Sequence, residues 1–207
     1  YLFTGPRGTG KTTTARILAK ALNCTNRKDS NPCNKCNNCV AINDASFMDL
    51  IEIDAASNRG IDEIRELKEK VGFLPVQGTY KVYIIDEVHM LTSEAFNALL
   101  KTLEEPPSNI VFILATTEVH KLPQTIISRT QRFDFKLATK DQLREKLTHI
   151  LKKEGVKFEE EAIDLIISSS GGSFRDSETI LEKVLSSTGY EKDKKVNVED
   201  VTTVLGF

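Results

Sequence analysis

The sequence of 207 residues contains no apolar run that approaches membrane-spanning length, no internal repeat and no low-complexity tract. These absences exclude a membrane-spanning chain and a repeat architecture. No secretory signal peptide is visible, so a soluble cytoplasmic protein is expected. The formal net charge of -2 means that the surface as a whole does not attract nucleic acid. Contact with a phosphate backbone would need a local basic face or neighbouring subunits.

The hydrophobic content of 40% is enough for one large domain, or for one domain with a small satellite. Short apolar runs alternate with amphipathic stretches in the first half, a pattern typical of a parallel sheet flanked by helices. Strands covered on both faces are predicted at Leu2–Thr4, Leu50–Ile53, Val82–Ile85 and Ile110–Ala115, with a shorter strand at Phe133–Phe135. Helices are predicted at Thr13–Leu22, Asp62–Val71 and Ser93–Glu105.

After about Lys136 the apolar residues recur only at helical spacing. Thr139–Gln142 has the form of a capping box, which predicts the start of a helix. Further helices are predicted at Glu159–Ser169, Arg175–Ser187 and Val198–Leu205, and a surface loop at Thr188–Lys195. The sequence therefore predicts an α/β domain over residues 1–137 and a small all-helical domain over residues 138–207.

A glycine-rich segment follows the first predicted strand and leads into the first predicted helix. Gly5-Pro6-Arg7-Gly8-Thr9-Gly10-Lys11-Thr12 fits the pattern G-x-x-x-x-G-K-[ST] at every fixed position. Glycines let backbone N–H groups turn toward phosphate oxygens, and a helix N-terminus favours the anion. We predict that this loop and Thr13 bind ATP, that Lys11 contacts the outer phosphates, and that Thr12 offers its hydroxyl to Mg²⁺. The alternative is a chance glycine turn before a helix.

Two carboxylates, Asp86 and Glu87, directly follow the third long predicted strand. We expect that strand to lie next to the first one, so that its C-terminal end is delivered beside the phosphate loop. We assign Asp86 to the magnesium shell and Glu87 to polarising the water that attacks the γ-phosphate. The alternative is a solvated acidic turn, but the complete phosphate loop upstream favours a hydrolytic site.

All four cysteines fall within one short segment with the spacing C-x8-C-x2-C-x2-C, at Cys24, Cys33, Cys36 and Cys39. This spacing lets four thiolates converge in a tetrahedron, which predicts a structural Zn²⁺ module over residues 24–39. Disulfides suit a cytoplasmic protein poorly, and an iron–sulfur cluster would imply redox chemistry of which the sequence gives no other sign. His89, His120 and His149 are interpreted as ordinary core or surface residues.

Three further segments match motifs of one ATPase family. Leu114-Ala115-Thr116-Thr117 ends a strand where AAA+ ATPases carry the sensor-1 polar residue. Ser128-Arg129-Thr130 is similar to the Ser-Arg-Cys motif, and Gly172-Ser173-Phe174-Arg175-Asp176 is similar to the sensor-2 motif of the helical lid. Together with the phosphate loop, the acidic pair and the cysteine insertion, these segments resemble the bacterial clamp-loader ATPases over essentially the whole chain.

The resemblance implies an AAA+ phosphate-loop domain with a helical lid that hydrolyses ATP with Mg²⁺, as part of the DNA polymerase III holoenzyme, a DNA-directed DNA polymerase. It implies a hetero-pentamer with other clamp-loader subunits that opens a sliding clamp and loads it onto primer–template DNA. Thr117 would orient the attacking water or the γ-phosphate, with Thr116 as the alternative. Arg129 would complete a neighbouring active site in trans, and Arg175 would reach the nucleotide in cis.

The sequence departs from the family at two positions. Thr130 stands where the family usually has cysteine, which should leave the charge of Arg129 intact. Ser177, which follows the sensor-2 motif, is more polar than usual and is interpreted as lying on the exposed side of the lid helix.

DNA contacts are predicted at Arg59, Arg65 and Lys101, on or near helices where the family meets duplex backbone, with Lys121 as a further candidate. Solvated surface charge is the alternative for each of them. Two other functions remain open: a different AAA+ DNA remodeller, such as a helicase loader or branch-migration ATPase, and a non-hydrolysing structural subunit that contains zinc.

Overall fold

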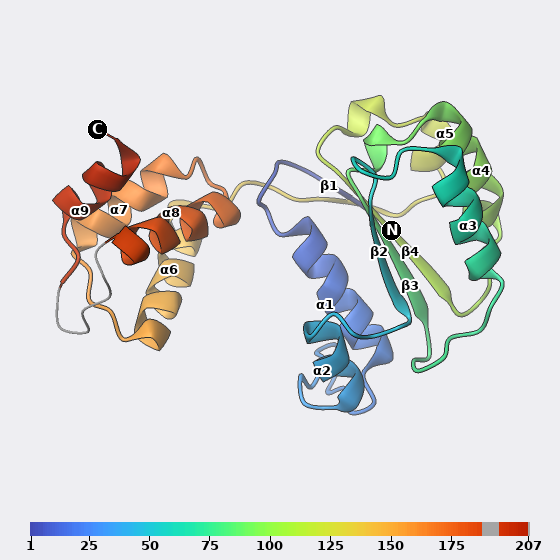
Figure 1. The fold of residues 1–207 in the computed structure, drawn as a ribbon, viewed down its shortest axis with the longest axis horizontal. Coiled ribbons are helices and arrows are strands. Elements are labelled where there is room, and N and C mark those ends of the chain that lie inside the picture. The colour runs from blue at the N-terminus through green and yellow to red at the C-terminus, as the bar shows by residue number, and fades with distance from the viewer. Residues whose placement is uncertain (188–194, 207) are drawn as a thin grey trace. The chain divides into compact units, whose positions relative to one another are not determined.

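Figure 1 shows the fold of the chain as a computed structural model, which describes residues 1–187 and 195–206. The described chain forms two compact units. The first contains Tyr1–Gly5 and Lys11–Phe135, and the second contains Pro6–Gly10 and the residues from Lys136 onward. Most of the surface loop predicted at Thr188–Lys195 lies outside the described residues, at 188–194.

In the described part of the chain, the first unit holds a five-stranded sheet in which all neighbouring strands are parallel. Its spatial order is β2-β3-β4-β1-β5, with β1 at Leu2–Thr4, β2 at Leu50–Asp54, β3 at Lys81–Asp86, β4 at Ile110–Thr116 and β5 at Arg132–Asp134. The five predicted strands are confirmed, with ends that differ by at most one residue. The expectation that the acidic strand lies next to the first strand is wrong, because β4 pairs with both β1 and β3 and separates them.

Successive residues of β3 point to opposite faces of the sheet and enter different cores. Val82 and Ile84 pack with Ala15 of α1, which spans Lys11–Asn23. Tyr83 and Ile85 belong to a second cluster, to which three further helices of this unit contribute. These helices are α3 (Ile61–Val71), α4 (Ser93–Glu104) and α5 (Gln124–Ile127). Figure 1 shows α1 on one side of the strands and α3 and α4 on the other.

The edges of the sheet differ from the prediction. β2 is an edge strand, in which Glu52 and Asp54 are exposed, so the expectation that both of its faces are covered is wrong.

The helix α2 (Asn37–Asn43) was not predicted from the sequence, because its asparagines are poor helix formers. Two short 3-10 turns, η1 (Val88–Met90) and η2 (Val119–Lys121), follow β3 and β4.

Two buried polar side chains fix the loop that leads into β3. The Asp49 carboxylate is fully buried and accepts hydrogen bonds of 2.6 to 3.0 Å from the backbone N–H groups of residues 76–78. Asn23, at the end of α1, accepts hydrogen bonds of 2.9 Å from the N–H groups of residues 79 and 80. The second pair of bonds ties the end of α1 to the start of β3, and so helps to align the two elements.

The helical part of the second unit contains α6 (Lys140–Glu154), α7 (Glu160–Ser169), α8 (Phe174–Ser187) and α9 (Val198–Leu205). The predicted capping box is confirmed, since Thr139 and Gln142 exchange side chain–backbone hydrogen bonds at 3.0 and 3.3 Å. Leu147, Ile166 and Val184 are buried in a common core contributed by all four helices. None of the described helices is long and apolar enough to cross a membrane.

Candidate nucleotide site and cysteine cluster

The loop between β1 and α1 has a backbone that requires glycine. Gly5, Gly8 and Gly10 have φ values of +140°, +74° and +92°, where other residues are strained. A Cβ on Gly5 would lie 2.2 Å from the carbonyl oxygen of Phe135, and one on Gly8 would lie 2.0 Å from the Ser173 hydroxyl. This conformation is of the kind in which successive N–H groups can converge on a phosphate.

The side chains that follow the loop lie at the N-terminus of α1, the positive end of its dipole. The ammonium of Lys11 is buried and donates to the carbonyl oxygen of Gly5 at 2.8 Å. The hydroxyl of Thr12 donates to Asp86 Oδ2 at 2.6 Å, while Thr13 is exposed. The N-terminus of α1 and the C-terminal end of β3 therefore meet, although β3 is not the neighbour of β1.

Asp86 and Glu87 face different partners. Asp86 Oδ1 accepts from the N–H of Glu87 at 2.9 Å, and its other oxygen accepts from Thr12. Glu87 has a φ of +47°, a left-handed conformation that is unfavourable for a residue with a Cβ. Its Oε2 accepts from the hydroxyl and the N–H of Thr117, at 2.9 and 3.4 Å. The strained turn thus separates the two carboxylates.

The side chain of His89, which is 5% exposed, lies against this turn. His89 Nδ1 is 3.0 Å from Thr116 Oγ1 and 3.4 Å from Glu87 Oε2, and Nε2 is 3.0 Å from Glu118 Oε2. Because a carboxylate can only accept, Nε2 carries a proton in the pairing with Glu118. The Lys121 ammonium, and next the neighbouring histidines, hold the pKa of Glu118 below its usual value. Of the two candidates for the sensor-1 residue, Thr116 contacts His89 and Thr117 contacts Glu87.

Arg129 lies after α5 and is bound within its own unit. Its Nε donates to the Glu104 carboxylate at 2.7 Å, and Nη1 donates to the carbonyl oxygen of Thr125 at 2.9 Å. The Thr130 hydroxyl instead donates to the carbonyl oxygens of residues 126 and 127, each at 3.1 Å. The Thr130 hydroxyl, which replaces a cysteine thiol, is therefore satisfied by the nearby backbone and takes no part in the contacts of the Arg129 guanidinium given above.

Arg175 is exposed in the first turn of α8. The N–H of Phe174 beside it donates to the carbonyl oxygen of Gly8 at 3.0 Å, a contact within the second unit. The interpretation of Ser177 as an exposed residue is wrong. Its side chain is fully buried, and the burial is tolerated because its hydroxyl donates to the carbonyl oxygen of Phe174 at 2.8 Å.

The candidate DNA-contacting side chains Arg59, Arg65 and Lys101 are all exposed in the first unit. Arg65 pairs with Asp62 on α3 at 3.2 Å. The ammonium of Lys121 pairs with the Glu118 carboxylate at 2.8 Å. Exposure alone fits a solvated charge as well as it fits a phosphate contact.

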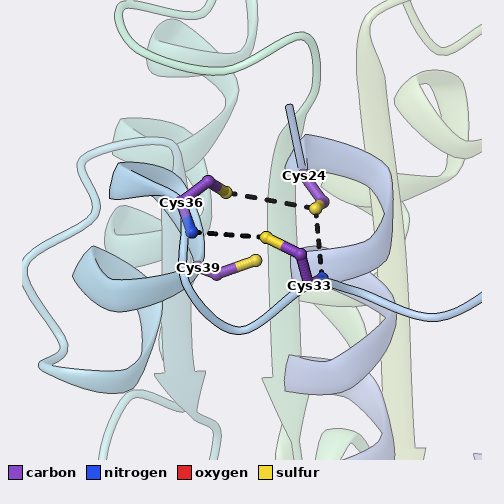
Figure 2. A group of neighbouring side chains, drawn as sticks. All are labelled: Cys24, Cys33, Cys36 and Cys39. Atoms are coloured by element: carbon purple, nitrogen blue, oxygen red, sulfur yellow. Dashed lines mark hydrogen bonds between the residues drawn. The ribbon is translucent and has the colours of Figure 1, made fainter. Parts of the chain in front are cut away.

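The four cysteines converge, as Figure 2 shows. Their sulfur atoms all lie within 4.8 Å of one another, and all four residues are free thiols. A tetrahedral Zn²⁺ with bonds of about 2.3 Å needs sulfur atoms roughly 3.8 Å apart. The Sγ atoms of Cys24 and Cys36 are 4.0 Å apart, so the cluster fits such an ion with little adjustment.

Backbone N–H groups point at two of the sulfurs. The N–H of Cys33 donates to Cys24 Sγ at 3.3 Å, and the N–H of Cys36 donates to Cys33 Sγ at 3.3 Å. Backbone hydrogen bonds lower the pKa of Cys33, and chiefly a backbone hydrogen bond involving Cys39 lowers that of Cys36 to about 5. Burial raises the pKa of Cys39 to about 12. A bound cation would favour the thiolate at all four positions.

Two family profiles match the chain. One, described as DNA polymerase III, delta subunit, matches residues 1–139, and the other, described as DNA polymerase III clamp loader subunit, ATPase lid domain, matches residues 142–189. The DNA polymerase III subunit tau of Bacillus subtilis is 52% identical over 206 residues, which are 100% of this chain and 36% of the relative. The chain belongs to the DNA polymerase III tau/gamma family.

Other tau/gamma relatives agree with this assignment. The DNA polymerase III subunit tau of Escherichia coli is 46% identical over 206 residues, covering 100% of the chain and 31% of the relative. The resemblance to bacterial clamp-loader ATPases, inferred from the motifs, is thereby confirmed. The chain spans about a third of the length of these tau/gamma relatives.

Solved structures share the fold. The RuvB Holliday junction branch migration motor of Thermotoga maritima aligns with a TM-score of 0.69 at 19% identity, over 99% of this chain and 60% of that one. A DNA polymerase III gamma subunit-related protein from the same organism aligns with a TM-score of 0.55 at 21% identity, over 99% of this chain and 71% of that one. At these identities the likeness supports the α/β fold with a helical lid and nothing finer.

Proposed function

We propose that the chain is the ATP-hydrolysing part of a clamp-loader subunit of DNA polymerase III. The observation that carries the proposal is the 2.6 Å contact between Thr12 on the phosphate-loop helix and Asp86 at the end of β3. These are the two oxygen ligands that a phosphate-loop ATPase offers to Mg²⁺. Membership of the tau/gamma family supports the rest of the assignment.

In this proposal each site residue has a definite task. Gly5, Pro6, Arg7, Gly8, Thr9, Gly10 and Thr13 form the ATP cradle. Lys11 exchanges its bond with the Gly5 carbonyl oxygen for the outer phosphates, which Mg²⁺ helps to neutralise. Glu87 polarises the attacking water, and Thr117, already hydrogen-bonded to Glu87, orients it.

The remaining catalytic groups are arginines. Arg129 stabilises the charge that develops on the nucleotide of a neighbouring subunit, a role that can raise the rate by about 10³- to 10⁵-fold. Arg175 reaches the nucleotide of its own subunit as part of the lid. The contact of Phe174 with Gly8, within the second unit, supports this second role, because Gly8 belongs to the ATP-binding motif.

We also propose that Cys24, Cys33, Cys36 and Cys39 hold a structural Zn²⁺, since four sulfurs at this separation leave no position for a substrate. The chain would assemble with other clamp-loader subunits, open a sliding clamp and place it on primed DNA in the cytoplasm. Arg59, Arg65 and Lys101 would contact the DNA backbone. The cysteine cluster and the identity over the whole chain favour this function over other AAA+ remodellers.

The proposal is tested on a complex assembled from the full-length protein. ATP hydrolysis should be stimulated jointly by the clamp and primed DNA, and Lys11→Ala should abolish the stimulation. Glu160→Gln, an exposed acid on α7, serves as a control that should retain it. A complex that binds the clamp and DNA but turns over ATP at the same rate with and without them would overturn the function.

A further inference from the structure

The guanidinium of Arg129 is held from two directions. Nε and Nη2 both donate to one oxygen of Glu104, and the Nε distance is 2.7 Å. Nη1 donates to the Thr125 carbonyl oxygen at 2.9 Å and to the Ser128 hydroxyl at 3.3 Å. An arginine that served only as surface charge would not need its plane fixed by a carboxylate, a carbonyl and a hydroxyl.

Stability does not account for this arrangement. The side chains of Arg129 and Glu104 are 32% and 45% exposed, and ion pairs at such sites contribute little to folding. Glu104 is also the last residue of α4, where a negative charge opposes the helix dipole, and Glu105 adds a second one. For the helix alone, the position of Glu104 is unfavourable.

We propose that Glu104 is a positioning residue that holds Arg129 ready for the neighbouring subunit. The inference rests on the proposed function, in which Arg129 acts in trans. A long arginine side chain loses considerable rotamer freedom when it must meet a phosphate. Because Glu104 and Thr125 already fix the guanidinium plane, that loss precedes assembly. Among the contacts of the described residues, the second N–H of Nη2 remains to be offered to the γ-phosphate.

The test uses complexes assembled from the full-length protein, with the clamp and primed DNA present. Glu104→Gln keeps the size of the side chain and removes the charge that holds Nε and Nη2. We expect kcat for ATP to fall by about 5- to 30-fold, the effect of losing one pre-ordered side chain. KM for ATP and the melting temperature should not change. Glu105→Gln is the matched control, with the same loss of charge one residue away, and should leave kcat unchanged.

A second arm repeats Glu104→Gln in an Arg129→Ala background, where no further loss of kcat is expected. If Arg129→Ala alone left turnover unchanged, the role of Arg129 in trans would fail, and the positioning role with it. If Arg129→Ala lowered turnover while Glu104→Gln matched Glu105→Gln or exceeded the wild-type rate, only the positioning role would be overturned. An equal loss in both backgrounds would point to a general structural effect and would also overturn it.

Discussion

Replacement of Asp49 by alanine should strongly destabilise the first unit without touching the candidate nucleotide site. The carboxylate is fully buried and accepts hydrogen bonds from the N–H groups of residues 76–78. Val76 and Gln77 are exposed, so water can reach their N–H groups once the carboxylate is removed. Each lost hydrogen bond should therefore cost about 1 kcal/mol, which gives about 3 kcal/mol for the three groups. For a protein of this size, that loss lowers the melting temperature by about 6–12 °C.

The assay is thermal unfolding followed by circular dichroism, with two comparison variants. Asp49→Asn keeps one acceptor oxygen and should lose less stability than Asp49→Ala. Asp44→Ala removes an exposed carboxylate at the end of α2 and should melt with the wild type. If Asp49→Ala melted together with Asp44→Ala, the hydrogen bonds from residues 76–78 to Asp49 would contribute nothing measurable to stability.

Three further outcomes are expected. The purified full-length protein should contain about one equivalent of zinc. Cys36→Ser should remove the zinc and increase amide exchange over residues 24–43, while β3 stays protected. The reason is that no described residue of that segment belongs to the two sheet cores. A wild-type protein without metal would contradict the zinc site. Thr117→Val should lower ATP turnover by about 10- to 100-fold with ATP binding retained, because it removes a hydrogen bond to the Glu87 carboxylate; unchanged turnover would leave Thr117 without an orienting role.

Most of the secondary structure could be predicted because apolar periodicity directly reflects which faces are buried. The three longer strands and the helices α1, α3 and α4 have this pattern, and the Thr139 capping box marks the start of α6 in the sequence itself. Strand order is different. Nothing local in the sequence says that β4 lies between β1 and β3, because that pairing depends on contacts between distant segments.

The residues missed by sequence reasoning owe their roles to tertiary contacts. Asp49 looks like an ordinary acid before a strand, yet it anchors a loop nearly thirty residues away. His89 lies two residues after Glu87, and that spacing could have drawn attention to it, but its contacts with Thr116 and Glu118 follow only from the pairing of β3 with β4. Ser177 was misread because a hydroxyl suggests exposure, whereas a backbone carbonyl one turn earlier satisfies it.

The proposed function is tested most sharply by the ATPase activity of a complex carrying Glu87→Gln, measured together with ATP binding. In that function Glu87 acts on the attacking water, while the phosphate loop, Lys11 and Thr12 bind ATP. The variant should therefore bind ATP as the wild type does, while turnover in the presence of the clamp and primed DNA should fall by about 10²- to 10⁴-fold. Normal turnover by the Glu87→Gln complex would contradict the role of Glu87 in polarising the attacking water.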